Sequence, residues 1–437
     1  MAPSTPFSDP LLPQLDLPET ATHYKRKHRA LRKFVREYVE TELLPHAQEW
    51  EEAGKVPDEV RKRYCSLGFS VVHPIIDPGD TGGVDLPFGI LHDEWDSWCA
   101  YICQDEFARM GWCGVSWGLN GGNGIGCPPV SRFGTPEQRR RWLPGAARGD
   151  LRFCLGITEA DAGSDVANIQ TSAVRQRDES GRDYYIVNGS KKWITNGIWA
   201  DYCTAAVRTG GPGHAGISLL VIPLKAEGVT TRRMYNTGVH ASGSTYITFD
   251  DVKVPVDHLL GKEGQGFALV MSNFNPERLA LATAAVRLSR VVAQDAYNYA
   301  CMRSTFGKKL IEHHAIRSKI ATFGLLIEPA HAYLEQLIHV VETARVTGKE
   351  VNVAGQTAML KVMSTRCLER CVREAQQILG GASYNKSGHG ARIENIGRDV
   401  RVHVVGGGSE EIMLDLAVRQ EAKDVKARVG GGSAAKL

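Results

Sequence analysis

The chain has 437 residues, enough for two or three packed units with substantial cores. Apolar residues make up 43% and charged residues 23%, which is typical of a soluble globular protein. The net charge of +3 is too small to indicate a nucleic-acid or membrane-surface partner, and no run is long and apolar enough to span a bilayer. The N-terminus also lacks a secretory apolar core and an Arg-rich transit pattern.

The first 150 residues predict a tail followed by helices. Residues 1–22 are rich in Pro and Ser and are expected to be flexible. Helices are predicted from Tyr24, over 57–67 and over 90–110, with a loop at 77–87. The basic run at 25–29 could bind phosphate or a membrane, but acidic residues follow it on the same helix, which favours a solvated face.

A glycine-rich run at 118–126, GLNGGNGIG, resembles a phosphate-binding loop at first sight. It lacks both a preceding strand and the Lys-Ser/Thr ending that this mechanism needs, so close helix packing is the better interpretation. Thr135 and Pro136 then predict an N-cap and first helical residue of a short helix through Trp142.

The pattern of apolar and polar residues changes twice more along the chain. From 151 to about 260, short alternating runs between turn residues predict strands, for example at 184–187, 217–222, 244–249 and 252–255. From 264 to 428 the helical period returns in four long patterns, 267–303, 314–347, 350–379 and 412–427, which predict a bundle of antiparallel helices.

The ten cysteines include no Cys-x-x-Cys pair. Two pairs, Cys99/Cys103 and Cys367/Cys371, have the spacing of one helix face. We expect buried free thiols in a reducing compartment, with neither a disulfide framework nor a metal site.

The most informative stretch runs from 154 to 197. Residues 155–167, LGITEADAGSDVA, predict a strand that stops at Thr158 and opens into a turn with unpaired donors. Residues 188–197, NGSKKWITNG, predict a hairpin turn at Asn188-Gly189 and a short strand with Trp193 and Thr195 on one side. Such a surface suits a flat, polar-edged heterocycle, while the pattern alone favours a plain hairpin with a core tryptophan.

These two runs, ITExxAGSD and KWITNG, resemble the flavin-binding signature of the acyl-CoA dehydrogenase family. The resemblance covers residues 23–428 and implies a mainly α fold with a central β domain. The implied domains are an N-terminal helical domain (23–150), a β-barrel (151–262) and a C-terminal four-helix bundle (263–428), between tails at 1–22 and 429–437. Asn168 replaces a small residue of the family, which would alter how the loop closes over a thioester.

The resemblance implies FAD as cofactor and a set of residues that bind it. The implied FAD-binding residues are Leu155, Ile157, Thr158, Gly163, Ser164, Trp193, Thr195, Arg303, Phe306, His313, His314, Gln377, Gly380, Gly381, Ser409 and Glu411. His314 stands where the family usually has Gln, and Ser383 where it usually has Gly. The implied substrate contacts are Ser164, Asn275, Arg278 and Gly408, with Arg278 either structural or facing CoA.

Residues 303–307, RSTFG, read locally as a helix end with a basic residue on the dipole and a glycine cap. In the family this arginine reaches the flavin pyrophosphate of a neighbouring subunit, a contact for which a guanidinium is well suited. If both this motif and the 377–381 motif act across an interface, the protein is a homodimer or homotetramer.

Desaturation next to a thioester needs a carboxylate for the α-proton, donors for the carbonyl oxygen and a hydride acceptor. The family's usual base position falls on Gly407, which can offer only its backbone N–H. The isovaleryl-CoA and long-chain branches place the base before an Arg on another helix, and Glu277-Arg278 matches that pattern. Locally, Asn275 and Pro276 could instead start a helix whose dipole Glu277 offsets.

The sequence thus predicts an acyl-CoA dehydrogenase that gives the α-proton to Glu277, the β-hydride to flavin N5 and a trans-2-enoyl-CoA as product. An acyl-CoA oxidase that uses oxygen and a non-dehydrogenating flavoprotein of the same fold stay open, and the electron acceptor is an electron-transfer flavoprotein or oxygen. The last residues, Ala435-Lys436-Leu437, are similar to the Ser-Lys-Leu peroxisomal address, so we expect a peroxisomal protein, or otherwise a cytosolic one.

Overall fold

The computed structural model describes residues 5–15, 17–72 and 76–430, so the predicted address at 435–437 lies outside the described residues. The chain forms two compact units. Of the described residues, the helical unit comprises those in 5–41, 96–111 and 275–430, and the sheet unit comprises those in 42–95 and 112–274.

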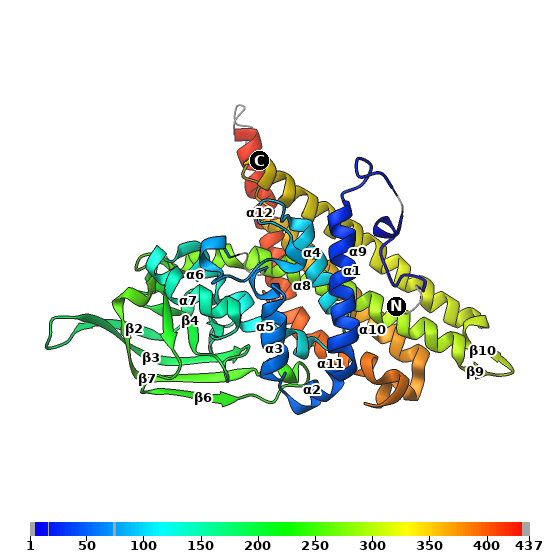
Figure 1. The fold of residues 1–437 in the computed structure, drawn as a ribbon, viewed down its shortest axis with the longest axis horizontal. Helices are drawn as coiled ribbons and strands as arrows, with labels where there is room; N and C mark the ends of the chain where they lie inside the picture. Colours follow the sequence, from blue (N-terminus) through cyan, green and yellow to red (C-terminus); the bar gives the residue numbers. More distant parts are fainter. Residues whose placement is uncertain (1–4, 16, 73–75, 431–437) are drawn as a thin grey trace. The chain divides into compact units, whose positions relative to one another are not determined.

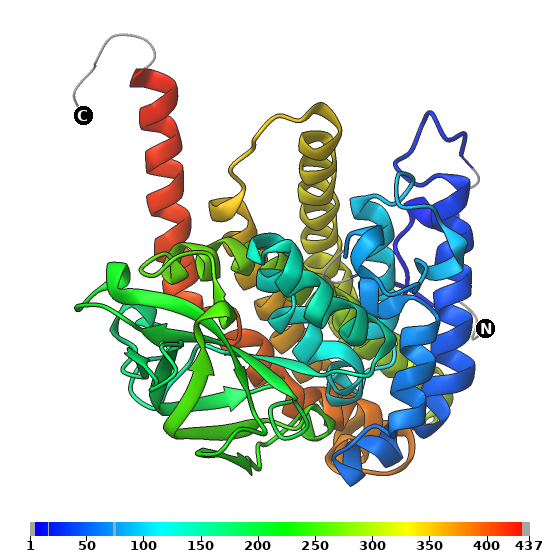
Figure 2. The same cartoon turned by 60° about the vertical axis from the view of Figure 1, so that its left-hand side comes forward.

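Among the described residues, the helical unit contains seven α-helices, of which α8 begins within the sheet unit's residues. These are α1 (Arg26–Tyr38), α4 (Ser97–Ala108), α8 (Gly266–Met302), α9 (His314–Thr347), α10 (Ala354–Leu379), α11 (Ala391–Val405) and α12 (Glu410–Gly430). Figure 2 shows α12, drawn in red, as one continuous helix. Buried Ala358 and Val362 of α10 pack against Met413 and Ala417 of α12.

The predicted helix over 90–110 is shorter than expected. It begins only at Ser97, because the carboxylate of Asp96 accepts a hydrogen bond from the N–H of Cys99 (2.9 Å) and caps it. The predicted helix α1 is confirmed, and Leu31 and Val35 on its apolar face are fully buried.

The sequence prediction of four long C-terminal helices missed α11. Its buried residues Ile393, Ile396, Val400 and Val404 recur at spacings of three and four. That pattern was present in the sequence, but the surrounding glycines and charges hid it. Arg392 at its start pairs with Asp295 of α8 through its Nε (2.7 Å).

In the part of the sheet unit that the structure describes, there are one eight-stranded sheet and five α-helices. The helices are α2 (Ala47–Ala53), α3 (Asp58–Ser66), α5 (Cys113–Gly126), α6 (Pro128–Phe133) and α7 (Pro136–Arg148). The strands are β1 (Phe153–Gly156), β2 (Ser172–Arg177), β3 (Asp183–Ile194), β4 (Tyr202–Arg208), β5 (Ile217–Pro223), β6 (Val229–Arg233), β7 (Thr245–Pro255) and β8 (Leu259–Leu260). Their order is β6-β7-β3-β2-β4-β5-β8, with β1 parallel to β4, and β2, β3, β7 and β6 lie side by side in Figure 1.

The hairpin turn predicted at Asn188-Gly189 is wrong. Strand β3 runs through both residues and shifts its register against β7 between Val187 and Gly189. Gly189 adopts φ +139°, and a Cβ there would lie 2.7 Å from Thr171 Cα. The Asn-Gly pair therefore marks a bulge where another backbone comes close, which a turn-based interpretation cannot distinguish.

Close packing of the glycine-rich run is confirmed, because it forms most of helix α5. A Cβ at Gly122 would lie 2.2 Å from Phe153 O, and one at Gly118 would lie 2.6 Å from Ala241 O. The capping of α7 by Thr135 is also confirmed, although α7 extends to Arg148 rather than ending near Trp142.

All ten cysteines are free thiols, and the expected burial is confirmed for nine of them, while Cys301 is exposed. Within the described residues, no helix combines the length and apolar character required to cross a bilayer.

Candidate active site

A buried ion pair holds the first motif in the sheet unit. Lys191 is fully buried, and its Nζ donates to Glu159 Oε1 (2.7 Å) and to Ile157 O (3.1 Å). The same carboxylate accepts from the N–H groups of Gln170 (2.6 Å) and Thr171 (3.0 Å). Burial raises the pKa of Glu159, but Lys191 and these donors outweigh it and lower the pKa. One carboxylate thus fastens both ends of the loop that follows β1.

The predicted cofactor residues of this loop differ in exposure. Ile157 is buried, Leu155 and Thr158 are half-buried, and Gly163 and Ser164 are exposed. A Cβ at Gly163 would meet no atom within 4 Å, so packing within the chain does not require glycine there. The loop therefore presents small residues and a hydroxyl on a fixed support.

Trp193 is not the core tryptophan of a plain hairpin, because 53% of it is exposed. Its φ of +65° breaks the strand alternation, and β3 ends at Ile194, so the premise that Trp193 and Thr195 face one side of a strand is wrong. Asn196, at φ +59°, accepts from the N–H of Gly122 (2.6 Å) and donates to Ser242 O (2.8 Å). Asn196 thereby fixes the turn that presents the indole.

In the helical unit, the 303–307 motif forms a small hairpin of β9 (Ser304–Thr305) and β10 (Lys308–Lys309). Arg303 and Phe306 are exposed, Phe306 by 97%. The ring of His313 is engaged by the hairpin, with Nε2 3.2 Å from Thr305 O, while His314 is exposed at the start of α9. This motif is therefore a projecting hairpin, and its arginine is not buried against its own helix end.

The remaining predicted cofactor residues lie at helix ends. Gln377, Gly380 and Gly381 are exposed at the C-terminal end of α10. Ser409 is half-buried and its carbonyl accepts from the N–H of Met413 (3.0 Å), which starts α12, and Glu411 is exposed.

Asn275, Pro276 and Glu277 do not start a helix, so that alternative is wrong: they lie inside α8. Glu277 and Asn275 are half-buried. Arg278 is buried, and its guanidinium donates to Gly407 O (3.0 Å, from Nε) and Asn275 Oδ1 (3.1 Å). These contacts favour the structural of the two roles predicted for Arg278. A proline inside a helix is unfavourable because it removes a backbone hydrogen bond, and such departures from local preference often occur at functional sites.

Gly407 cannot take a side chain without strain. Its φ is +67°, and a Cβ would lie 2.9 Å from Leu281 Cδ1. Leu281 lies four residues after Glu277 on α8, so both project from one face of the helix, with Cβ atoms roughly 5–6 Å apart. Glu277 is therefore about one helical turn from the place where a side chain at Gly407 would start.

Sequence reasoning missed two buried lysines, Lys191 and Lys361. Lys361 of α10 is fully buried, and its Nζ donates to Gly408 O (2.8 Å) and to Val404 O. The signal was an ionisable residue at helical spacing from the apolar Ala358 and Leu368.

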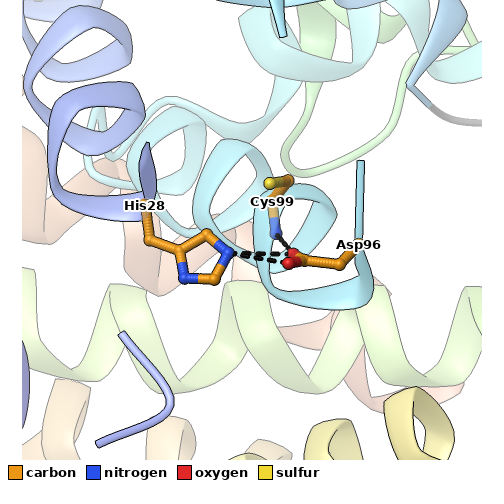
Figure 3. Close-up of side chains that lie close together, drawn as sticks. All are labelled: His28, Asp96 and Cys99. Atoms are coloured by element: carbon orange, nitrogen blue, oxygen red, sulfur yellow. Dashed lines mark hydrogen bonds and ion pairs between the residues drawn. The ribbon is translucent and has the colours of Figure 1, made fainter. Parts of the chain in front are cut away.

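A separate cluster in the helical unit has the residue types of a metal site: His28, Asp96 and Cys99 (Figure 3). The Nδ1 of His28 accepts from the N–H of Lys25 (3.0 Å), so the ring proton is on Nε2, which donates to Asp96 (2.9 Å). Lys27 also pairs with Asp96 (2.8 Å), and burial raises the pKa of Cys99 to about 12. The side chains of His28 and Asp96 are therefore already engaged within the protein, where they connect α1 to the start of α4.

Comparison with known proteins gives consistent matches over most of the chain. Three family models match: the acyl-CoA dehydrogenase N-terminal domain over residues 25–150, the middle domain over 154–252 and the C-terminal domain over 264–421. Acyl-CoA dehydrogenase AFT10-1 of Alternaria alternata is 44% identical over 426 residues, which cover 97% of each chain.

Solved structures show the same likeness. A probable acyl-CoA dehydrogenase from Mycobacterium abscessus has a TM-score of 0.82 and 32% identity, covering 92% of this chain and 100% of its own. An acyl-CoA dehydrogenase from Bacillus anthracis, solved in complex with FAD, shares the fold with a TM-score of 0.82 at 23% identity, covering 97% of this chain and 71% of its own.

Proposed function

This chain belongs to the acyl-CoA dehydrogenase family of oxidoreductases, and on that premise we propose that it converts an acyl-CoA thioester to the trans-2-enoyl-CoA with Glu277 as the base. One observation carries the assignment of the base. A side chain at Gly407 would be strained by its φ of +67° and would press on the end of the Leu281 side chain, and Glu277 projects from the same helix face one turn earlier. A carboxylate from α8 can therefore act close to the position of the family's commoner base.

The residues present fit FAD as cofactor. In the sheet unit, the exposed indole of Trp193, the Thr158 and Ser164 hydroxyls and the open side of Gly163 would hold its ring system. In the helical unit, the projecting Arg303 suits a pyrophosphate, since a guanidinium can bind it in two places. When bound, FAD supplies the acceptor for the β-hydride.

The chain's own residues carry the proton chemistry. Glu277, as a carboxylate, removes the α-proton of the thioester and holds it. The backbone N–H of Gly407 binds the thioester oxygen, on which negative charge develops as the α-proton leaves. Asn275, Gly408 and Ser164 are proposed to contact the substrate.

The function is tested by mixing the purified yellow protein with a series of acyl-CoAs in the absence of oxygen. We expect at least one acyl-CoA to bleach the absorbance band of the oxidised flavin, which lies at about 450 nm. Bleaching by no acyl-CoA would instead indicate a non-dehydrogenating flavoprotein. Fast peroxide formation in air without an added acceptor would indicate an oxidase.

The cofactor assignment has its own test, since we propose that Arg303 serves the FAD of a partner subunit in a dimer or tetramer. Arg303→Ala should release FAD on gel filtration, while Lys308→Ala on the same exposed hairpin should retain it. Equal FAD content in both variants would contradict the role of Arg303.

We also propose that the chain is imported into peroxisomes through Ala435-Lys436-Leu437. Deleting these three residues, or fusing a protein after them, should leave the chain in the cytosol. An unchanged distribution would show that the tripeptide is accidental.

A further inference from the structure

The connection between α11 and α12 contains three consecutive glycines, Gly406–Gly408, followed by Ser409. The N–H of Gly406 still bonds to Val402 O (2.9 Å), which closes α11. Gly407 and Gly408 then adopt φ values of +67° and +113°. Two successive residues of positive φ form a backbone path that glycine alone follows easily.

Two cations from other helices bind the carbonyls around this turn. Lys361 of α10 donates to Val404 O and to Gly408 O (2.8 Å). Arg278 of α8 donates to Gly407 O (3.0 Å). The turn is therefore held by its acceptors.

The backbone N–H groups of the turn remain available to donate hydrogen bonds to a ligand. In a trans peptide the N–H points opposite to the C=O, so the N–H groups of Gly408 and Ser409 point away from Arg278 and Lys361. In the part of the chain that the structure describes, no hydrogen bond is recorded from the N–H of Gly407, Gly408 or Ser409. Successive free N–H groups in such a turn form a site for an oxygen that carries negative charge.

Holding the turn with Lys361 carries a desolvation cost. It is fully buried, and no ion pair is recorded for it among the described residues. Burial and the neighbouring charge of Arg278 lower its pKa to about 8, while Glu410 opposes the shift. A hydrocarbon side chain would fill the space without desolvating a charge, so the cost calls for a function.

The neighbouring groups leave the positive charge in place. His403, also fully buried, has its pKa lowered to about 4 by burial and by Lys361, so it is neutral near pH 7. Glu410 is engaged by the Nε of Arg366 (2.9 Å). A cation bound to a carbonyl polarises that peptide and strengthens its N–H as a donor.

We propose that Lys361 is a positioning residue that, together with Arg278, fixes the Gly406–Gly408 turn and polarises the N–H groups of Gly408 and Ser409, which bind the thioester carbonyl oxygen beside the N–H of Gly407. This inference rests on the proposed function, because it assigns the turn to the carbonyl of that substrate. It adds a residue that touches neither the substrate nor the cofactor.

The experiment compares two ligands that differ at the carbonyl. A 3-thia-acyl-CoA keeps the thioester but cannot be desaturated, and the S-alkyl-CoA with the same 3-thia chain lacks only the carbonyl oxygen. Both are titrated calorimetrically into the FAD-loaded protein, and the ratio of their affinities reports the interactions that depend on the carbonyl group. The wild-type protein should prefer the thioester.

Lys361→Met should lower affinity for the thioester about tenfold and leave the thioether within about twofold. Arg290→Met is the matched control, since Arg290 is a buried cation of α8 that holds Phe7 O (3.0 Å) and Glu328 (2.8 Å) instead. Its ratio should remain that of the wild type. An unchanged ratio in Lys361→Met, or an equal loss for both ligands, would overturn the proposal.

A titration of the wild type keeps the proposal testable if Lys361→Met does not fold. Between pH 7 and 9 Lys361 loses its proton, whereas Arg278 stays charged, His403 stays neutral and Glu410 stays ionised. The neutral amine still donates two hydrogen bonds, so the turn persists while its polarisation falls. The affinity ratio should drop across this range, and a flat ratio would overturn the role of Lys361. Flavin bleaching by an acyl-CoA together with a flat ratio would leave the proposed function intact.

Discussion

Two buried groups of charges in the helical unit differ in how they are compensated. The ion cluster consists of Arg32, Arg36, Arg109, Arg287, Asp9, Asp105 and Glu106. Its pairs are short, for example Arg287 Nη2 to Asp105 Oδ2 (2.6 Å) and Arg32 Nη1 to Glu106 Oε1 (2.7 Å). At the glycine turn, by contrast, Lys361 and Arg278 are bound to backbone carbonyls.

The difference separates a structural use of charge from a functional one. In the ion cluster, burial raises the pKa values of Asp105 and Glu106, but the arginines outweigh burial and hold both well below their ordinary range. Its charges are satisfied by one another, and they also fix the N-terminal segment, since Arg287 donates to Ser8 O (2.9 Å). The turn retains positive charge near free donors, which is useful only if a negative oxygen arrives there.

The largest expected effect comes from breaking the ion cluster. Arg287→Met leaves Asp105 and Asp9 short of a partner in a buried place and should lower the free energy of unfolding by about 3–5 kcal/mol. Lys361→Met should cost no more than about 1–2 kcal/mol, because it leaves carbonyls rather than charges unpaired. Urea unfolding measures both, and equal losses would contradict the comparison.

As the pH is lowered, stability should be lost through His403, next to the turn, before it is lost through the ion cluster. The pKa of His403 is about 4 in the folded chain and about 6.5 when unfolded, so the unfolded chain binds more protons between these values. Stability should therefore fall as the pH drops from about 6.5 towards 4, by about 1.4 kcal/mol per pH unit from this group. The carboxylates of the cluster lose their contribution only at lower pH.

His403→Gln isolates that contribution. Unfolding free energies at pH 7 and pH 5 should differ less in the variant than in the wild type, by about 2 kcal/mol. An identical pH dependence in the two proteins would show that His403 is not held neutral.

A smaller effect is expected from filling the turn itself. Gly407→Ala places a Cβ at φ +67° and 2.9 Å from Leu281 Cδ1, which should cost about 1–2 kcal/mol of stability. Trimming the contact in Gly407→Ala with Leu281→Val should recover part of this loss. Gly79→Ala, where a Cβ meets nothing within 4 Å, is the control and should change little. If Gly407→Ala is neutral, a side chain at Gly407 is not strained, and the reason for assigning the base to α8 disappears.

Much of the fold could be predicted from the sequence, because long periodic stretches determine it. The helix at 314–347 and the strand at 217–222 follow directly from spacing, while the predicted runs 244–249 and 252–255 form one strand, β7. The predicted domain boundaries stay a prediction. The errors arose where backbone contact decides: Asn188-Gly189 forms a bulge because Thr171 lies against it, and α4 starts late because of the Asp96 cap.

The candidate site was predictable as a set of motifs but not as geometry. No local pattern shows that Leu281 crowds Gly407 or that Lys361 reaches the carbonyls of a turn more than forty positions along the chain. These contacts depend on helix packing, which brings α8, α10 and the 406–408 turn together within the helical unit. The roles of Glu277 and the cofactor residues were inferred by resemblance, and they stay predictions.

The central claim is that the carboxylate on α8 removes the α-proton. The most direct measurement is the anaerobic rate of flavin reduction by the best acyl-CoA in wild type and Glu277→Gln, at matched FAD content. Glu277→Gln keeps the shape but cannot accept a proton, so the rate should fall by at least ~10²–10⁴-fold, together with exchange of the α-protons into D₂O. Wild-type rates of reduction and exchange in Glu277→Gln would contradict the account and direct attention to Glu410 or Glu411.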